Sequence, residues 1–246
     1  LGHESEHHNS NKFYPMLAKG LGRDAIYFDY VTTVEGALGD AAYLNKFDAL
    51  LLYANHGRIK PGQWRNLKAF VEGGGGFVPV HCASWCFGNE PGFDQLVGGR
   101  FASHKTGTFT AKVVDPKHPA MAGVKEFEAW DETYKHRNHN KKDRQVLMVR
   151  EVAEKGDNIT DPEPWTWART QGKGRVFYTA SGHDERVWKQ PAFHQLLKAG
   201  ILWSVGDARK QSYETFIAGR ALLKYEKRDN IPNYEKRSEP LPYQFP

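Results

Sequence analysis

Several histidines stand where the sequence predicts the ends of β-strands or the loop before the first helix. They are His7 in the first loop, His56 after Phe47–Tyr53, His81 after Phe77–Val80 and His183 after Arg175–Ala180. Because the carboxyl ends of strands in an open α/β sheet meet at one edge, we expect these imidazoles to converge there. Imidazole can bind a divalent metal such as zinc, or transfer a proton near neutral pH. The pattern therefore predicts a histidine-rich site.

Two carboxylates and an aromatic ring form a second group, in the segment Asp131-Glu132-Thr133-Tyr134. A carboxylate beside an imidazole can take part in acid–base chemistry, bind the same metal or fix the imidazole tautomer. The segment could instead be the exposed end of a strand. We take His81, His183 and Glu132 as the candidate catalytic residues.

The candidate metal ligands are His7, His56, His81 and His183, and zinc is the expected ion. No pair of them has a diagnostic short spacing such as HExxH, so proton transfer without a metal stays open. His56 and His183 could also simply end a strand or form a turn. His8 is expected to point to solvent while His7 points inward, and His136 is expected to lie in a solvated basic loop.

Aromatic and polar side chains near these positions could bind a sugar, because the C–H face of a sugar packs well on an aromatic ring. The candidate substrate-binding residues are Trp85, Tyr134, Asp184 and Trp188. The two cysteines, Cys82 and Cys86, are interpreted as buried thiols, because their spacing is a weak metal signal and one helical turn rarely suits a disulfide.

The elements that would position these residues alternate between strands and helices, which favours βαβ units and a parallel sheet. Helices are predicted at Asn11–Leu21, Pro61–Glu72 and Phe193–Val205. Strands are predicted at Ala25–Val31, Phe47–Tyr53, Phe77–Val80 and Arg175–Ala180. Alternating patterns at Gly107–Val114, Gln145–Val152 and Pro164–Arg169 predict an antiparallel extension or a flap.

Charge and hydropathy argue against two classes of partner. The chain of 246 residues has a net charge of only +5, and its basic excess is densest in Lys135–Arg144 and Lys224–Arg237. No nucleic-acid-binding motif accompanies these residues, so we expect no nucleic-acid partner. No apolar run is long enough for a membrane span.

Two longer stretches resemble the ThuA-like (trehalose utilisation) family. They are GGGGFVPVHCASW at Gly73–Trp85 and GRVFYTASGHDERVWKQPA at Gly174–Ala192, with shorter matches at GGRF (Gly98–Phe101), DPKHPAM (Asp115–Met121), DETY (Asp131–Tyr134) and GILW (Gly200–Trp203). The resemblance implies a class I glutamine amidotransferase-like fold. The expected architecture is a flavodoxin-like three-layer sandwich with a mainly parallel sheet plus an antiparallel extension.

Amidotransferase chemistry is not expected. In enzymes of this fold a cysteine occupies the sharp turn after a strand, and a His–Glu pair activates its thiolate. The resemblance aligns His81, not Cys82, with that turn, and Gly182-His183-Asp184 departs from the His-x-Glu pattern.

The resemblance implies instead a bacterial carbohydrate-processing domain for disaccharide or keto-sugar utilisation, with a small-molecule carbohydrate as its partner. A hydrolase or lyase reaction would suit an imidazole base beside a metal. The alternative is a noncatalytic sugar-binding or interaction domain, because fold does not settle function.

The domain is expected to span residues 1–206, with its first strand missing or upstream of Leu1. Residues 207–246 are expected to form a helix at Ala208–Lys227, docked by Phe216, Leu222 and Leu223, and then a proline- and charge-rich linker. Such a linker suggests fusion to a further domain. A secreted or periplasmic location is also expected, with any signal segment upstream of this chain.

Overall fold

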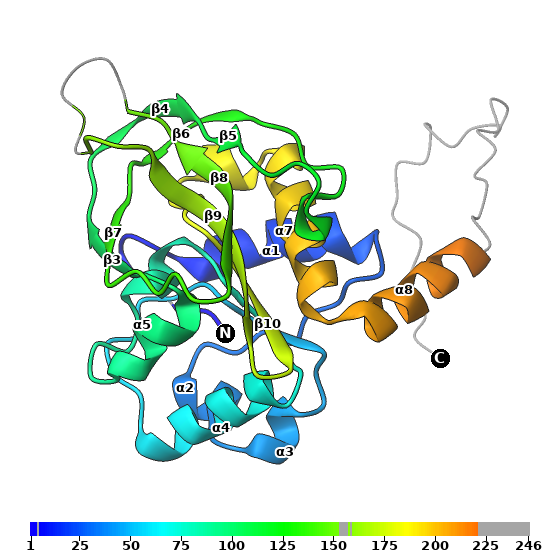
Figure 1. The fold of residues 1–246 in the computed structure, drawn as a ribbon. Helices are drawn as coiled ribbons and strands as arrows, with labels where there is room; N and C mark the ends of the chain where they lie inside the picture. The colour runs from blue at the N-terminus through cyan, green and yellow to red at the C-terminus, as the bar shows by residue number, and fades with distance from the viewer. Residues whose placement is uncertain (4, 153–156, 158, 221–246) are drawn as a thin grey trace, which may run out of the picture.

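A mixed six-stranded sheet forms the centre of the molecule in a computed structural model, which describes residues 1–3, 5–152, 157 and 159–220 (Figure 1). Its order is β1 (Ala49–Leu52), β2 (Gly76–Pro79), β10 (Gly174–Thr179), β9 (Glu163–Gln171), β8 (Arg144–Arg150) and β5 (Lys112–Val113). Two small antiparallel sheets pair β3 (Arg100–Ser103) with β7 (Lys135–Arg137) and β4 (Thr106–Thr110) with β6 (Glu128–Glu132).

Only one half of the sheet is parallel. β1, β2 and β10 run parallel, and their short apolar sequences suit strands that are covered on both faces. β9, β8 and β5 continue the same sheet in antiparallel pairs, which confirms the expected antiparallel extension, but the extension makes up half of the sheet, so the sheet as a whole is mixed and not mainly parallel. The physical reason is the tight turn at Gly172 between β9 and β10, since a parallel pair would need a long crossover.

Helices pack on both faces of the sheet (Figure 1). Tyr178 of β10 pairs with Trp167, whose indole donates to the carbonyl of Val97, so this face lies under α5. Phe177 points to the opposite face, under α7. The helices are α1 (Ser10–Gly22), α2 (Val34–Leu38), α3 (Ala41–Leu44), α4 (Pro61–Glu72), α5 (Pro91–Val97), α6 (Glu185–Trp188), α7 (Pro191–Ser204) and α8 (Asp207–Gly219), with 3₁₀ turns η1 (His81–Trp85) and η2 (Pro119–Met121).

The predicted strand Ala25–Val31 is extended but is not part of a sheet. The Gly2 amide donates to the Val31 carbonyl, and Leu1 in turn bonds Leu51 of β1 and the amide of Tyr53 just after that strand. Two residues can make isolated bonds but no ladder. An apolar hollow lies between this segment and β1.

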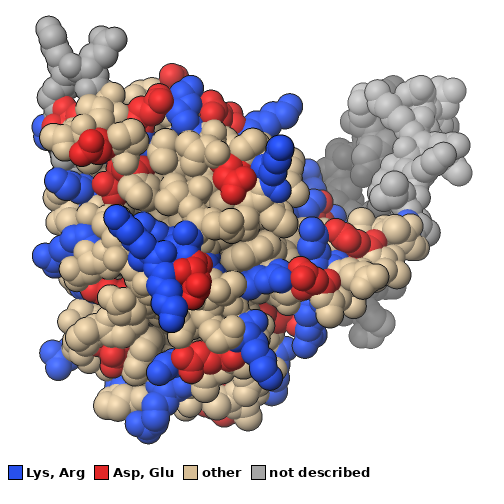
Figure 2. Space-filling model, in the orientation of Figure 1, with Lys and Arg blue, Asp and Glu red and all other residues tan. Residues whose placement is uncertain are grey.

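The end of the chain is described only in part. α8 confirms a helix after residue 206, but Phe216 is 57% exposed and does not dock as expected. Leu222, Leu223 and the predicted linker lie outside the described residues, as does part of the predicted loop at 156–164. Within the described part of the chain, no helix has the length and apolar character of a membrane span. Basic and acidic side chains are interspersed over the face that Figure 2 shows.

Candidate functional site

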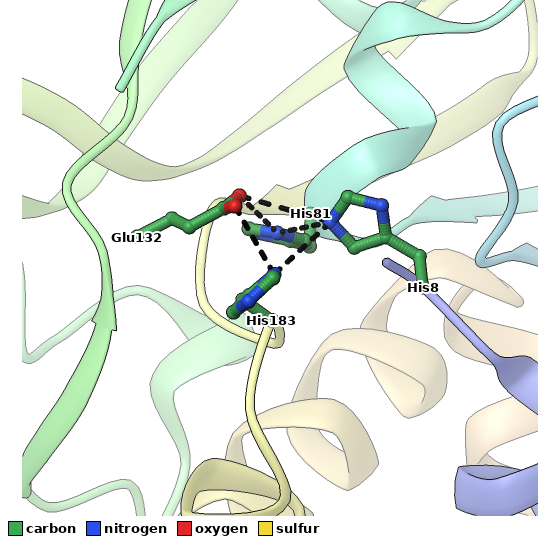
Figure 3. Close-up of side chains that lie close together, drawn as sticks. All are labelled: His8, His81, Glu132 and His183. Carbon is green, nitrogen blue, oxygen red and sulfur yellow. Dashed lines mark hydrogen bonds and ion pairs between the residues drawn. The ribbon is translucent and has the colours of Figure 1, made fainter. Parts of the chain in front are cut away.

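Three imidazoles and one carboxylate converge near the carboxyl ends of the parallel strands (Figure 3). The Nε2 atom of His8 lies 3.1 Å from Nε2 of His81 and 3.2 Å from Nδ1 of His183. The Glu132 carboxylate lies 3.2 Å from both His81 Nε2 and His183 Nδ1. Four ligand atoms placed tetrahedrally around zinc at about 2.0–2.2 Å stand about 3.3–3.6 Å apart. The cluster therefore already has a spacing close to that of a metal-binding donor set.

His81 is fixed at the turn where the chain leaves β2. It follows the bridge between Val80 and Thr179, begins η1, and has a left-handed backbone with φ +49°. Its Nδ1 lies 2.6 Å from the carbonyl oxygen of Ala180, which can only accept, so Nδ1 carries the proton. The Nε2 lone pair is then directed at Glu132 and His8. A metal-binding histidine typically has this arrangement, with its other nitrogen donating to a carbonyl.

The charges of the cluster favour a cation at its centre. Burial lowers the pKa of His81 to about 4 and also lowers the pKa of His183, so both rings are neutral near pH 7. Burial alone would raise the pKa of Glu132, but the surrounding imidazoles of His8, His81 and His183 hold that pKa well below its usual range. Neutral imidazoles around an ionised carboxylate are the protonation states that metal binding requires.

Asp131 positions two of these residues through their backbones. Its carboxylate accepts hydrogen bonds from the amides of Gly182 and His183 at 2.9 and 3.0 Å, and from the amide of Glu132 at 2.9 Å. Burial raises the pKa of Asp131 to about 7, although these three donors oppose the rise. The contact ties the loop between β10 and α6 to the end of β6.

The N-terminal segment supplies His8, the remaining member of the cluster. The amide of His8 donates to Ser5 Oγ at 2.9 Å, and its ring packs edge-on against Tyr53. His8 is buried, whereas the neighbouring His7 is exposed. The structure thus reverses the expected orientations of this pair. Adjacent loop residues point in different directions, so the sequence could indicate that one of them faces inward but not which one.

Two hollows flank the cluster. The first, of about 270 Å³, is lined by His7, His8, Asn55, Trp85, Phe101, His104, Glu132 and Tyr134. The second, of about 450 Å³, is lined by Glu6, His7, Asn9, Lys12, Phe13, His183, Asp184, Glu185, Arg186 and Lys189. Each therefore has at least one cluster residue in its wall. The apolar hollow beside Leu1 is separate from both and contains no cluster residue.

Three of the four predicted sugar-binding residues line the hollows beside the cluster, and the fourth is buried. Trp85 is 40% exposed and lines the first hollow, where Tyr134 stacks on His81 with ring centroids 4.2 Å apart. Asp184 caps α6 and pairs with Arg186 at the edge of the second hollow. Trp188 is only 1% exposed, so its ring, stacked on Phe13, has no face free for a ligand.

His56 lies away from the cluster. Its Nε2 is 3.1 Å from the carbonyl oxygen of Gly2, and its ring contacts His3. The sequence placed it after β1 correctly, but the chain turns the side chain toward the N-terminal segment. His104 is exposed, yet its Nε2 lies 3.5 Å from the Glu132 carboxylate.

The cysteines are unsuited to nucleophilic chemistry. Both are fully buried, and Cys86 Sγ contacts the carbonyl of Ala54. Burial raises the pKa of Cys82 well above its usual value and that of Cys86 to about 12. A thiol held protonated in this way is a poor nucleophile.

Comparisons with known proteins agree with this architecture. A family model described as ThuA, trehalose utilisation, matches residues 1–204. The structure of a ThuA-like protein from Bacteroides uniformis superposes with a TM-score of 0.67 at 19% identity, covering 82% of this chain and 89% of that one. A ThuA-like protein from Parabacteroides merdae gives 0.67 at 18% identity, covering 83% and 88%.

A β-galactosidase from Bacillus circulans sp. alkalophilus also shares the fold in part. Its TM-score is 0.56 at 17% identity, and the match covers 81% of this chain but 28% of that larger protein. At such identities the likeness concerns the fold alone. No match to a curated protein was found.

Proposed function

Because this chain belongs to the ThuA family, whose description is trehalose utilisation, we propose that it processes a disaccharide or a keto-sugar derived from one. The proposed centre is a divalent cation, zinc in the first instance, held by His8, His81, Glu132 and His183. The fold is that of the glutamine amidotransferases, but the proposed chemistry does not use their cysteine.

The observation that carries the metal proposal is the direction of the His81 lone pair. A neutral His81 has one ring proton, which Nδ1 donates in a hydrogen bond to the Ala180 carbonyl oxygen. Nε2 then faces a carboxylate oxygen at 3.2 Å and another imidazole nitrogen at 3.1 Å. These electron-rich atoms repel one another unless a proton or a cation lies between them. Nitrogen and carboxylate oxygen together are a suitable donor set for zinc.

The two hollows support a polyhydroxyl ligand. Trp85 and Phe101 give the first hollow an aromatic wall, on which a sugar ring can stack. The second hollow is polar, and its charges balance, because three cations (Lys12, Arg186 and Lys189) face three carboxylates (Glu6, Asp184 and Glu185). A balanced polar wall favours neutral hydroxyl groups over a phosphate.

The chain's own residues would bind and orient the sugar. A bound divalent cation supplies Lewis-acid polarisation of a substrate oxygen. Tyr134 and Trp85 shape the hollow beside it, and Asp131 keeps His183 and Glu132 in register. A hydrolase or lyase reaction on the sugar is the activity we propose.

A second function, sugar binding without catalysis, is favoured by one observation. Four protein donors can fill the coordination shell of tetrahedral zinc, as in structural sites, whereas catalytic zinc usually keeps a position open. In that case the cation would hold the N-terminal segment against the sheet and the hollows would bind a sugar.

Metal analysis of the purified protein tests the proposal. We expect the chelator-treated protein to take up about one zinc per chain, and Glu132→Gln to weaken binding at least tenfold, because it removes the one anionic donor. Glu128→Gln is the matched control, since Glu128 lies on the same strand but is exposed. Failure of the native chain to bind zinc, manganese or nickel at micromolar concentration would contradict the metal site.

Calorimetry with trehalose then separates the two functions. Binding that depends on zinc and on Trp85, followed by product formation, supports the enzyme. Binding of the sugar to the zinc-loaded protein without turnover of trehalose or 3-ketotrehalose supports the second function.

A further inference from the structure

A second buried histidine–glutamate pair lies behind the cluster. His136 of β7 and Glu163 of β9 are 4% and 7% exposed, against the expectation that His136 lies in a solvated loop. β7 turns it inward between Trp167 and Tyr178, whose rings it meets edge-on. Neither residue lines either hollow beside the cluster. The pair therefore has no direct route to a ligand there.

Hydrogen bonds connect this pair to the backbone of His81. Glu163 Oε1 accepts from both the amide and Nδ1 of His136, at 3.0 and 2.9 Å. His136 Nε2 is then 2.9 Å from the Tyr178 hydroxyl. That hydroxyl lies 3.1 Å from the carbonyl oxygen of His81 and 3.0 Å from Ser84 Oγ, which is itself 3.1 Å from the same carbonyl.

The polar hydrogens of these residues are enough to give the His81 carbonyl a donor in either protonation state of His136. With Glu163 ionised and Nδ1 of His136 protonated, Nε2 of a neutral His136 accepts from Tyr178. Ser84 is then free to donate to the carbonyl of His81. If His136 is protonated, its Nε2 donates to Tyr178, and Tyr178 donates to that carbonyl. In both states the carbonyl has a hydroxyl donor, and no side-chain atom of the network is among the unpartnered buried atoms of the described residues.

The network contacts His81, whose left-handed backbone has to be stabilised by its surroundings. A left-handed conformation is unfavourable for a residue other than glycine, and a buried ionisable pair is itself costly to desolvate. His81 is held on its ring side by Ala180 and on its carbonyl side by Ser84 when His136 is neutral, or by Tyr178 when His136 is protonated. The ring can point Nε2 at Glu132 only while this backbone is retained.

We infer that Glu163, His136, Tyr178 and Ser84 are positioning residues that hold His81 in its left-handed conformation and thereby set the affinity of the cation site. The inference rests on the proposed metal function, but the positioning of His81 can be measured without a metal.

The test compares Tyr178→Phe with Tyr213→Phe. Each removes a tyrosine hydroxyl that lies within reach of a backbone carbonyl, but that of Tyr213 bonds Asp24, far from the cluster in the fold. Two quantities are measured: the zinc Kd, and the exchange rate of the His81 Nδ1 proton in metal-free protein by NMR. The resonance that is present in the native protein and absent from His81→Asn is assigned to that proton. Ser84→Ala is the second variant, should Tyr178→Phe fold poorly.

We expect Tyr178→Phe to raise the zinc Kd about tenfold or more and to speed exchange of the His81 proton by a similar factor, with Tyr213→Phe at native values. Unchanged Kd and exchange in both Tyr178→Phe and Ser84→Ala would overturn the inference. If the native chain binds no metal, the proposed function fails, and the exchange rate alone then decides whether this network positions His81.

Discussion

At the scale of single residues, His81 links backbone conformation to chemistry. It occupies the turn after β2. Its Nδ1 donates a hydrogen bond to the Ala180 carbonyl, and its Nε2 contacts the Glu132 carboxylate. The sequence predicted its place because it directly follows an apolar strand. The depth of its burial could not be predicted, since that depends on the Tyr134 ring stacked on it from a distant segment.

Burial of His81 makes the metal-free protein sensitive to acid. Its pKa is lowered to about 4 from 6.5, so between these pH values the unfolded chain carries a proton there that the native protein lacks. Stability from this residue is fully present above pH 6.5. We expect it to fall by about 1.4 kcal/mol per unit as the pH drops toward 4.

Urea unfolding at pH 7.5, 6.0 and 5.0 measures this slope. His81→Asn is the comparison, because asparagine tolerates the left-handed backbone but has no proton to gain in this range. The variant should show a shallower slope than the native protein, and identical slopes would refute the assignment.

At the scale of elements, the site depends on how the end of β6 meets the loop after β10. Asp131 joins them by accepting three backbone amides. The sequence indicated that Asp131 or Glu132 could orient an imidazole. It could not show that Asp131 acts through backbone amides, because that requires the two segments to be adjacent in space.

Asp131→Asn should loosen this junction. The amide side chain has one oxygen acceptor, so at least one buried N–H loses a bond, at a cost of about 1–3 kcal/mol. We expect a lower free energy of unfolding and faster hydrogen exchange at Gly182 and His183. Asp184→Asn is the control, since asparagine caps a helix as well as aspartate does. Equal effects of the two substitutions would argue against the role of Asp131.

At the scale of the whole molecule, the predicted arrangement of strands and helices is correct where local pattern determines it. The helix predicted at Pro61–Glu72 and the parallel strands β1, β2 and β10 are confirmed. The order of the antiparallel strands beside β10 and the position of the segment at 25–31 were not predictable, because pairing partners decide both. His8 and His136 were misplaced for the same reason: a loop or a short strand has no periodicity that marks its inner face.

The close approach of α7 to the sheet gives a prediction in which two effects compete. Alanine favours a helix over glycine by about 1 kcal/mol, yet a Cβ at Gly200 would overlap the ring of Phe177. Overpacking should dominate, so Gly200→Ala should destabilise the protein by about 1–3 kcal/mol in chemical denaturation. Gly219→Ala, where a Cβ meets open space, should be neutral or slightly stabilising. A stabilised Gly200→Ala would contradict the close packing.

The donor cluster joins segments that are far apart along the chain: His81 is 73 positions after His8, and Glu132 is 51 positions after His81. In an unfolded chain, bringing these atoms together would cost the conformational entropy of closing long loops. A cation would therefore bind the folded state almost exclusively. The melting temperature would then rise with the logarithm of free metal concentration, so the midpoint of thermal unfolding would report how much metal is available to the protein.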